Sequence, residues 1–285
     1  MIVLVTVPTL LALGVAWAFI PAQPLPFSPP PRRRGPTIAE PRSHLPEWVS
    51  QNRRNVARAM AGPVPLLFLG DSITVGWLDP GLPSRDRRGP LAIWDARYAP
   101  RRAENFGIGG DHVEHLLWRL RHGELGRIQP EVVILLIGTN NIGLDPPGAI
   151  AEGIAAVIAE IRRRSPRTHV VLFGLFPRGL TSGHGRLPFA ETPDPRIAEV
   201  NRLIAPLGDL PRVTYLDIGD RLLDPDGRID RDTQPDLLHL SSRGYAIWAD
   251  AMEPTLDLLL GKPDAPAPRR EDQPSTPRNR PPSTR

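Results

Sequence analysis

Residues 66–72 read LLFLGDS, an apolar run that ends at a glycine, an acid and a hydroxyl. A short apolar run without alternation is typical of a strand that is buried on both faces of a parallel sheet. The polar end predicts that the chain leaves the sheet abruptly at this point. We expect Gly70 to allow a sharp exit. Asp71 is expected to brace the loop through hydrogen bonds to backbone amides, and Ser72 to stand at the edge of the sheet.

Further strands and helices alternate along the chain after this run. Strand patterns occupy residues 103–107, 131–138, 168–176 and 212–218, and helical patterns occupy residues 112–125, 149–165, 195–207 and 242–260. Strands that are separated by helices imply a parallel sheet with helices on both faces. We therefore predict an α/β fold of three layers, α/β/α, with about five parallel strands, and a functional site at the carboxyl ends of those strands.

The remaining segments predict appendages to a single folded domain. Residues 1–20 are almost wholly apolar, which is typical of a signal peptide or a membrane anchor. Residues 21–40 are rich in proline and arginine and predict an extended linker. Residues 41–262 are expected to form the domain. Residues 263–285 have almost no apolar content and are expected to be disordered.

Two features near the N-terminus bear on the cell compartment. The small residues of AWA, residues 16–18, fit a signal-peptide cleavage site, whereas the arginines at residues 32–34 favour keeping that side in the cytoplasm. We favour an exported, periplasmic or membrane-anchored protein, with any membrane association made through residues 1–20. A cytoplasmic location is the alternative.

The composition excludes several classes of function. There is no cysteine, which rules out disulfides, thiolate zinc sites and a cysteine nucleophile. The formal net charge is +4 and the pI is about 10.2, but much of the excess arginine lies in the flanking segments. No basic helix or aromatic stripe accompanies it, so nucleic-acid binding is not expected. Aspartate and histidine are scattered, so no metal or other cofactor is expected.

Polar residues collect where the predicted strands end. The four segments are GDS at 70–72, NFGIGGD at 105–111, GTNN at 138–141 and DLLHLS at 236–241. Each of them alone has an ordinary interpretation as a helix cap, a tight turn or a surface pair. The carboxyl ends of parallel strands meet at one edge of a sheet, however, so these segments can converge although the sequence separates them.

Together these segments supply the groups that acyl transfer requires. The hydroxyl of Ser72 needs a base to accept its proton, and His239 is the candidate. Asp236 lies three residues before His239 and can orient the imidazole through its other nitrogen. The candidate donors to a developing oxyanion are the backbone amides of Ser72 and Gly110 and the side-chain amide of Asn140.

On these four segments the chain is identified as a member of the SGNH (GDSL-type) hydrolase superfamily, and the resemblance covers residues 66–260. Within the superfamily it resembles most the catalytic subunits of intracellular platelet-activating-factor acetylhydrolase, through NFGIGGD, LWRLRHGEL and GLFPRG. The resemblance implies a flavodoxin-like fold, Ser72 as nucleophile, His239 as base, Asp236 as its orienting acid, and the oxyanion donors named above. It also raises the expectation of a homodimer.

The resemblance implies a serine esterase of short acyl groups, with acetyl favoured, acting on a small ester substrate without a cofactor. An O-acetyl esterase of cell-envelope or other glycans is an alternative, which an exported location would favour. A non-catalytic carbohydrate- or lipid-binding module on a hydrolase scaffold is a third hypothesis, disfavoured because all four reactive groups are intact. An insertion at residues 78–90 departs from the family pattern and is expected to reshape the substrate pocket.

Overall fold

The computed structural model describes residues 34–79, 89–180 and 190–262. Five parallel strands form the main sheet, in the order β2-β1-β3-β4-β7. They are β1 (Leu66–Gly70), β2 (Ala103–Asn105), β3 (Val132–Leu136), β4 (His169–Phe173) and β7 (Val213–Leu216). Because β1 pairs with β2 on one side and with β3 on the other, the strand order reverses at β1. Ligand sites of open parallel sheets lie at such a switch point.

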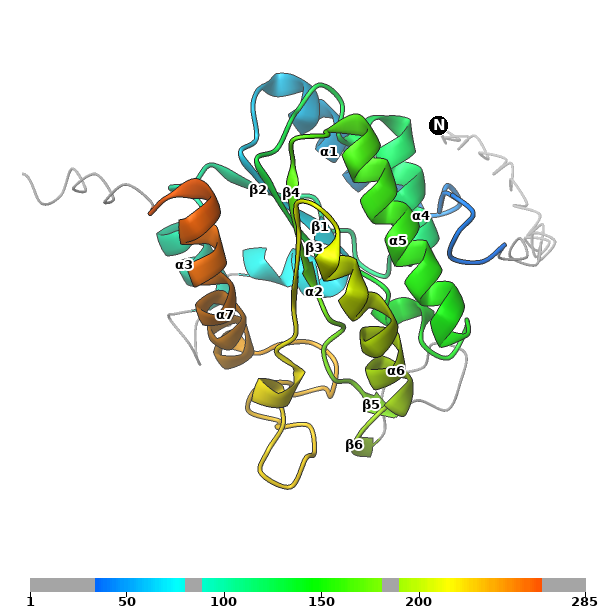
Figure 1. Ribbon diagram of the computed structural model, residues 1–285, viewed down its shortest axis with the longest axis vertical. Coiled ribbons are helices and arrows are strands. Elements are labelled where there is room, and N and C mark those ends of the chain that lie inside the picture. The colour runs from blue at the N-terminus through cyan, green and yellow to red at the C-terminus, as the bar shows by residue number, and fades with distance from the viewer. Residues whose placement is uncertain (1–33, 80–88, 181–189, 263–285) are drawn as a thin grey trace, which may run out of the picture. The chain divides into compact units, whose positions relative to one another are not determined.

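Helices cover both faces of this sheet (Figure 1). On one face α4 (Val113–Arg119), α5 (Pro147–Arg164) and α6 (Pro195–Ile204) pack in a row, and on the other α3 (Pro90–Arg97) packs against α7 (Ser242–Leu260). The helix α1 (Pro46–Ala61) precedes β1 and packs against the turn that follows α4. This arrangement confirms the predicted three-layer α/β/α fold with five parallel strands.

Short elements complete the described part of the chain. The single-turn helix α2 (Ser72–Val75) follows β1 directly. The strands β5 (Gly179–Leu180) and β6 (Ala190–Pro193) form an antiparallel pair that the sequence did not predict. The 3₁₀ turns are Gly76–Leu78, Thr139–Asn141, Ala205–Asp209 and Gly219–Leu222.

Helix boundaries account for most differences from the sequence predictions. The helix predicted at residues 112–125 is shorter, because α4 ends at Arg119 and a π-helical turn, Leu120–Glu124, follows it. Gly123 has a φ of +105° there, which ends the helical path. The helix α1 was not predicted, since it buries only Trp48, Asn55 and Ala59, and a buried amide breaks the apolar periodicity.

An aromatic core connects α7 to the segment that follows β1. Trp77 is fully buried, and its ring centroid lies 5.0 Å from that of Trp248 and 5.2 Å from that of Tyr98. The hydroxyl of Tyr245 donates to the carbonyl of Ile73 at 2.7 Å. The beginning of α7 is therefore fixed beside α2, which brings residues from the two ends of the domain together.

Several sequence predictions fall outside the described residues, namely the apolar segment 1–20, most of the linker, most of the insertion 78–90 and the tail 263–285. Within residues 34–40, Pro36 is buried against Gly153 of α5, and the amide of Glu40 donates to the carbonyl of Glu114 at 3.2 Å. Among the described residues, none of the helices is both long enough and apolar enough to span a membrane.

The end of β1 requires glycine for a different reason from the one expected. Gly70 does not adopt a left-handed conformation. A Cβ at this position would lie 2.1 Å from Thr74 Oγ1 and 2.3 Å from the carbonyl oxygen of Leu136 on the neighbouring strand. The glycine therefore provides space for close packing of backbone against backbone where the chain enters α2.

Replacing Gly70 by alanine should destabilise the domain by about 2–3 kcal/mol, because a backbone carbonyl in a paired strand cannot move aside. The measurement is chemical denaturation of the purified domain. Gly148→Ala is the matched control, since a Cβ on Gly148 near the start of α5 meets nothing within 4 Å. Equal stability of the two variants would contradict this explanation.

Candidate active site

The loop after β1 places Ser72 at the first position of α2. Asp71 is the N-cap of that helix, and its Oδ1 accepts a hydrogen bond from the amide of Ile73 at 3.0 Å. Such a cap satisfies a helical amide that has no partner within the helix. The predicted bracing role of Asp71 is therefore confirmed for this amide.

The structure brings Ser72, His239 and Asp236 together at the same edge of the sheet. Ser72 Oγ lies 2.9 Å from His239 Nε2, and His239 Nδ1 lies 2.7 Å from Asp236 Oδ2. The side chains of His239 and Asp236 are 42% and 48% exposed, so reactants can reach them from solvent. The hydroxyl and the carboxylate occupy opposite nitrogens of one imidazole, as the sequence predicted.

The carboxylate of Asp236 also organises its own loop. Its Oδ1 accepts from the amides of Leu238 at 3.0 Å and His239 at 2.6 Å. Burial alone would raise the pKa of Asp236, but the hydrogen bonds from the His239 side chain and from these amides outweigh it and hold the pKa below its usual 3.8. Asp236 is therefore ionised at neutral pH and able to orient the imidazole.

Hydrogen bonds anchor the loop that carries His239. Leu237 adopts a left-handed φ of +65°, which is uncommon for a bulky residue, and its carbonyl accepts from the amide of Gly179 at 2.8 Å. Gln234 is fully buried, and its Nε2 donates to the carbonyls of Pro177 at 2.8 Å and Leu238 at 3.0 Å. These bonds fix the loop to the segment after β4.

The two remaining predicted residues lie in the loops after β2 and β3. Gly110 has a φ of +73°, a conformation that favours glycine. Asn140 lies in the 3₁₀ turn after β3, and its Nδ2 donates to the carbonyl of Asp111 at 2.9 Å. The same nitrogen lies 3.5 Å from Asp71 Oδ2, at the limit of a hydrogen bond. Asn140 is thus held between the first two loops of the site.

A buried ionic cluster supports these loops. Arg119 on α4 is fully buried between Glu124 and Asp111, and its Nε donates to Asp111 Oδ2 at 2.8 Å. Its other nitrogens donate to the carbonyl of Phe106 at 2.8 Å and to that of Gly70 at 3.2 Å. Burial raises the pKa of both carboxyl groups, and Arg119 opposes that shift.

Arg178, in the segment after β4, is a buried residue and does not line the cavity beside Ser72. It is 3% exposed, and its Nη1 donates to the carbonyl of Thr139 at 2.6 Å. Burial lowers its pKa, while the charges of Asp194 and Asp71 act in the opposite direction. Arg178 therefore ties the loop that carries Asn140 to the segment that also holds the His239 loop.

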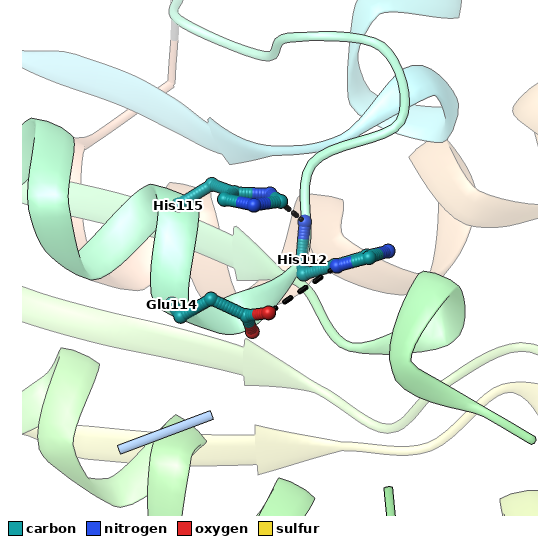
Figure 2. A group of neighbouring side chains, drawn as sticks. All are labelled: His112, Glu114 and His115. Carbon is teal, nitrogen blue, oxygen red and sulfur yellow. Dashed lines mark hydrogen bonds and ion pairs between the residues drawn. The ribbon is translucent and has the colours of Figure 1, made fainter. Parts of the chain in front are cut away.

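Within the described residues, the side chains of His112, Glu114 and His115 form the only group whose nitrogen and oxygen atoms lie close enough to suggest a metal site (Figure 2). The two imidazole rings are stacked, with centroids 4.8 Å apart and an interplanar angle of 21°. An imidazole nitrogen binds a metal in the plane of its ring, at about 2.0–2.1 Å, so nearly parallel stacked rings cannot share one ion.

The same three residues have a structural role instead. The amide of His112, the N-cap of α4, donates to His115 Nδ1 at 2.9 Å. His112 Nδ1 lies 3.3 Å from Glu114 Oε1, and Asn141 donates to Glu114 Oε2 at 3.0 Å. These contacts fix both histidines at the start of α4.

A cavity of about 690 Å³ opens at Ser72 and His239. Its lining includes Ser72 and His239 together with Val75, Leu78 and Pro90. The lining also includes Asp79, Ser241, Ser242 and Tyr245. The walls thus combine a few polar side chains with apolar ones, which is the usual composition of a small-molecule site.

Comparisons with known proteins identify the family and the fold. Residues 68–247 match the GDSL-like lipase/acylhydrolase family. The chain is 33% identical over 219 residues to the human platelet-activating factor acetylhydrolase IB subunit alpha1, covering 75% of this chain and 85% of the relative. It is 36% identical over 203 residues to the chicken alpha2 subunit, covering 70% and 79%. A GDSL-like lipase from Bacteroides thetaiotaomicron shares the fold, with a TM-score of 0.57 at 18% identity, over 73% of this chain and 98% of that one.

The chain therefore belongs to the GDSL-like lipase/acylhydrolase family, and it is an ester hydrolase.

The supporting residues were the part of the site that sequence reasoning missed. Arg119 lies three positions after Leu116 and therefore on the apolar face of its helix. A charged residue on such a face signals a buried ion pair, but its partners Asp111 and Glu124 could be identified only from the fold. Gln234 and the anchoring role of Arg178 carried no comparable signal.

The electrostatics of Asp71 generate a pH prediction. Burial raises the pKa of Asp71 from 3.8 to about 7, with Asp111 adding to the effect and His239 and Arg178 opposing it. The folded protein binds this proton more tightly than the unfolded chain. The associated stability is complete below pH 3.8 and is lost as the pH rises through 7.

Asp71→Asn removes this titration and keeps an oxygen for the amide of Ile73. The stability of the variant relative to the wild type should be about 3 kcal/mol higher at pH 8 than at pH 5. Denaturant unfolding at both pH values measures the difference. Replacement of the exposed Asp226 by asparagine is the control and should show no such change; a pH-independent difference for Asp71→Asn would contradict the prediction.

Proposed function

We propose that this chain hydrolyses short-chain esters, with acetyl the favoured acyl group. Ser72 is the nucleophile, His239 the general base and Asp236 the acid that orients it. The observation that carries the proposal is the continuous line of contacts, 2.9 Å and 2.7 Å, from Ser72 Oγ through the imidazole to Asp236. A base must lie within hydrogen-bond reach of the proton that it removes, and His239 Nε2 satisfies this condition.

The reaction runs in two halves. Ser72 Oγ attacks the ester carbonyl carbon while its proton passes to His239 Nε2, and Asp236 stabilises the imidazolium through Nδ1–H. His239 then protonates the leaving alcohol as the carbon–oxygen bond breaks, which leaves an acyl group on Ser72. Water attacks this acyl-enzyme with His239 again as base, and the carboxylic acid departs as Ser72 recovers its proton.

The negative charge that develops on the carbonyl oxygen needs donors that are already in place. We assign this role to the backbone amides of Ser72 and Gly110 and to Asn140 Nδ2. The amide nitrogen of asparagine carries two hydrogens. One of them is donated to the carbonyl of Asp111 at 2.9 Å, which fixes the side chain. The second meets only the long 3.5 Å contact with Asp71 Oδ2, which a bound oxyanion would replace.

Acetyl is favoured because the curated relatives named above are acetylhydrolases. The non-catalytic alternative has no use for an imidazole held between a hydroxyl and a carboxylate. The remaining alternative is an esterase of acetylated glycans. An assay of acetate released from acetylated glycans and from acetyl lipids distinguishes the two substrate classes.

Ser72→Ala should lower kcat for a short acetyl ester by roughly 10⁴–10⁶-fold, because the triad acts as a unit. A fluorophosphonate should label Ser72 in the wild type and fail to do so in His239→Ala, as read by peptide mass mapping. The other serines of the same digest serve as the internal control. Undiminished ester hydrolysis by Ser72→Ala would refute the mechanism.

Asn140→Ala should lower kcat by roughly 10²–10³-fold with little change in melting temperature, as expected for the loss of one oxyanion donor. Asn141→Ala is the contrasting variant. Asn141 is fully buried and bonds the amide of Val113 at 3.0 Å and Asp145 at 2.9 Å, so its loss should lower the melting temperature. If the two variants lost stability and activity in parallel, the special role of Asn140 would be disproved.

A further inference from the structure

A second hollow lies next to the cavity at Ser72. This α1 groove, of about 830 Å³, runs between α1 and the loop after β2, and its lining includes Arg42, Trp48, Arg54, Ile108 and Gly109. It shares Val75 and Leu78 with the walls of the cavity that holds Ser72 and His239. The two hollows are therefore neighbours on one surface.

The α1 groove begins beside the nucleophile. A Cβ built on Gly109 would lie 4.0 Å from Ser72 Cβ, so the backbone of Gly109 is in near contact with the reactive serine. Val75 and Leu78, which separate the two hollows, are 39% and 44% exposed. Large apolar side chains that face solvent beside a reactive group are suited to cover the carbon skeleton of a bound substrate.

Arg42 places a positive charge at this junction. Its Nη1 donates to the carbonyl of Gly109 at 2.9 Å. Its two terminal nitrogens, Nη1 and Nη2, lie 3.0 and 3.2 Å from the position of a Cβ on Gly110. The guanidinium thus lies against Gly109 and against Gly110, whose amide is one of the proposed oxyanion donors, while the Arg42 side chain is 21% exposed.

A carboxylate pairs with this guanidinium from its buried side. Asp111 Oδ1 lies 3.8 Å from Arg42 Nη1, and Asp111 Oδ2 pairs with Arg119 at 2.8 Å. Asp111 is fully buried, so it leaves the exposed part of the guanidinium open to the groove. The groove lining contains a second cation, Arg54, and a single acid, Glu47. Arginine binds phosphate and carboxylate through paired N–H donors, which makes it the preferred side chain for anion recognition.

We propose that the α1 groove binds the alcohol portion of the ester, and that Arg42 pairs with an anionic group carried by that portion close to the scissile bond. This inference rests on the proposed function, since a short acyl group leaves the larger arm of the substrate to fill the groove. The ligand class is an ester whose alcohol bears a phosphate, sulfate or carboxylate, with apolar atoms packed on Trp48, Val75 and Leu78.

The test compares esters that differ in charge but not in acyl group. One pair is acetylglycerol 3-phosphate and acetylglycerol, and the other is 3-acetoxypropanoate and its methyl ester. For the wild type we expect kcat/KM to be about tenfold higher for the anionic member of the preferred pair, mainly through KM, as one charge-assisted contact would give. The pair with the larger ratio identifies phosphate or carboxylate as the preferred anion.

Arg42→Gln should bring this ratio close to one, and Arg42→Lys should restore part of it because the charge is retained. Arg53→Gln is the matched control, since it removes the same charge from an exposed position of α1 outside the groove lining. The ratio is the decisive quantity, because a loss of the Gly109 brace alone would lower the rates for both members equally.

An unchanged ratio in Arg42→Gln, or a wild-type ratio near one for both pairs, would overturn the groove assignment while ester hydrolysis by Ser72 stands. A folded wild type that hydrolyses none of the four esters and resists fluorophosphonate would instead overturn the proposed function. Should Arg42→Gln fail to fold, competition in the wild type decides. Inorganic phosphate must inhibit acetylglycerol hydrolysis competitively, relative to sodium chloride of equal ionic strength, and absence of such inhibition rejects the proposal.

Discussion

The arrangement of the site depends on the hydrogen bonds of one guanidinium, that of Arg119. It is fully buried, and it binds the carbonyl of Gly70 at the end of β1, the carbonyl of Phe106 after β2 and the carboxylate of Asp111. One planar cation thereby fixes the exits of two adjacent strands relative to each other. A buried cation needs paired anions, and Asp111 and Glu124 provide them. Desolvating these three charges costs free energy, and the contacts of the cluster hold the loops in place rather than adding to the stability of the fold.

Asp111 connects this cluster to two further parts of the domain, the turn after β3 and the helix α1. Its backbone carbonyl accepts from Asn140 after β3, and its Oδ1 accepts from Trp48 Nε1 on α1 at 2.7 Å. The helix α1, which precedes every reactive segment in the sequence, is thus attached to the loop that carries Gly110. A displacement of α1 would move Asp111, and with it both the loop that carries Gly110 and the anchor of Asn140.

The fold class and the convergence of Ser72, His239 and Asp236 could be predicted from sequence because each has a local signal. The fully buried runs of β1 and β3 carry no alternation, and the glycine, serine, asparagine and histidine follow strands or loops in a fixed order. The helix α1 and the turn after α4 were not predicted, because burial of Asn55 and the positive φ of Gly123 depend on tertiary partners. The pairing of Arg119 with Glu124 has the same origin, since nothing in the local sequence distinguishes a buried carboxylate from a solvated one.

The position of Arg42 follows from the same connections. Gly109 and Gly110 have no side chains, which lets the guanidinium approach their backbone directly. The loop that carries Gly110 therefore has Ser72 on one side and a groove with a partly exposed cation on the other. Asp111, the next residue, is held by Arg119 at 2.8 Å and lies 3.8 Å from Arg42, so its carboxylate meets the guanidinium of Arg42 from the buried side. The buried cluster that fixes the loop after β2 therefore also positions Arg42 at the entrance of the α1 groove.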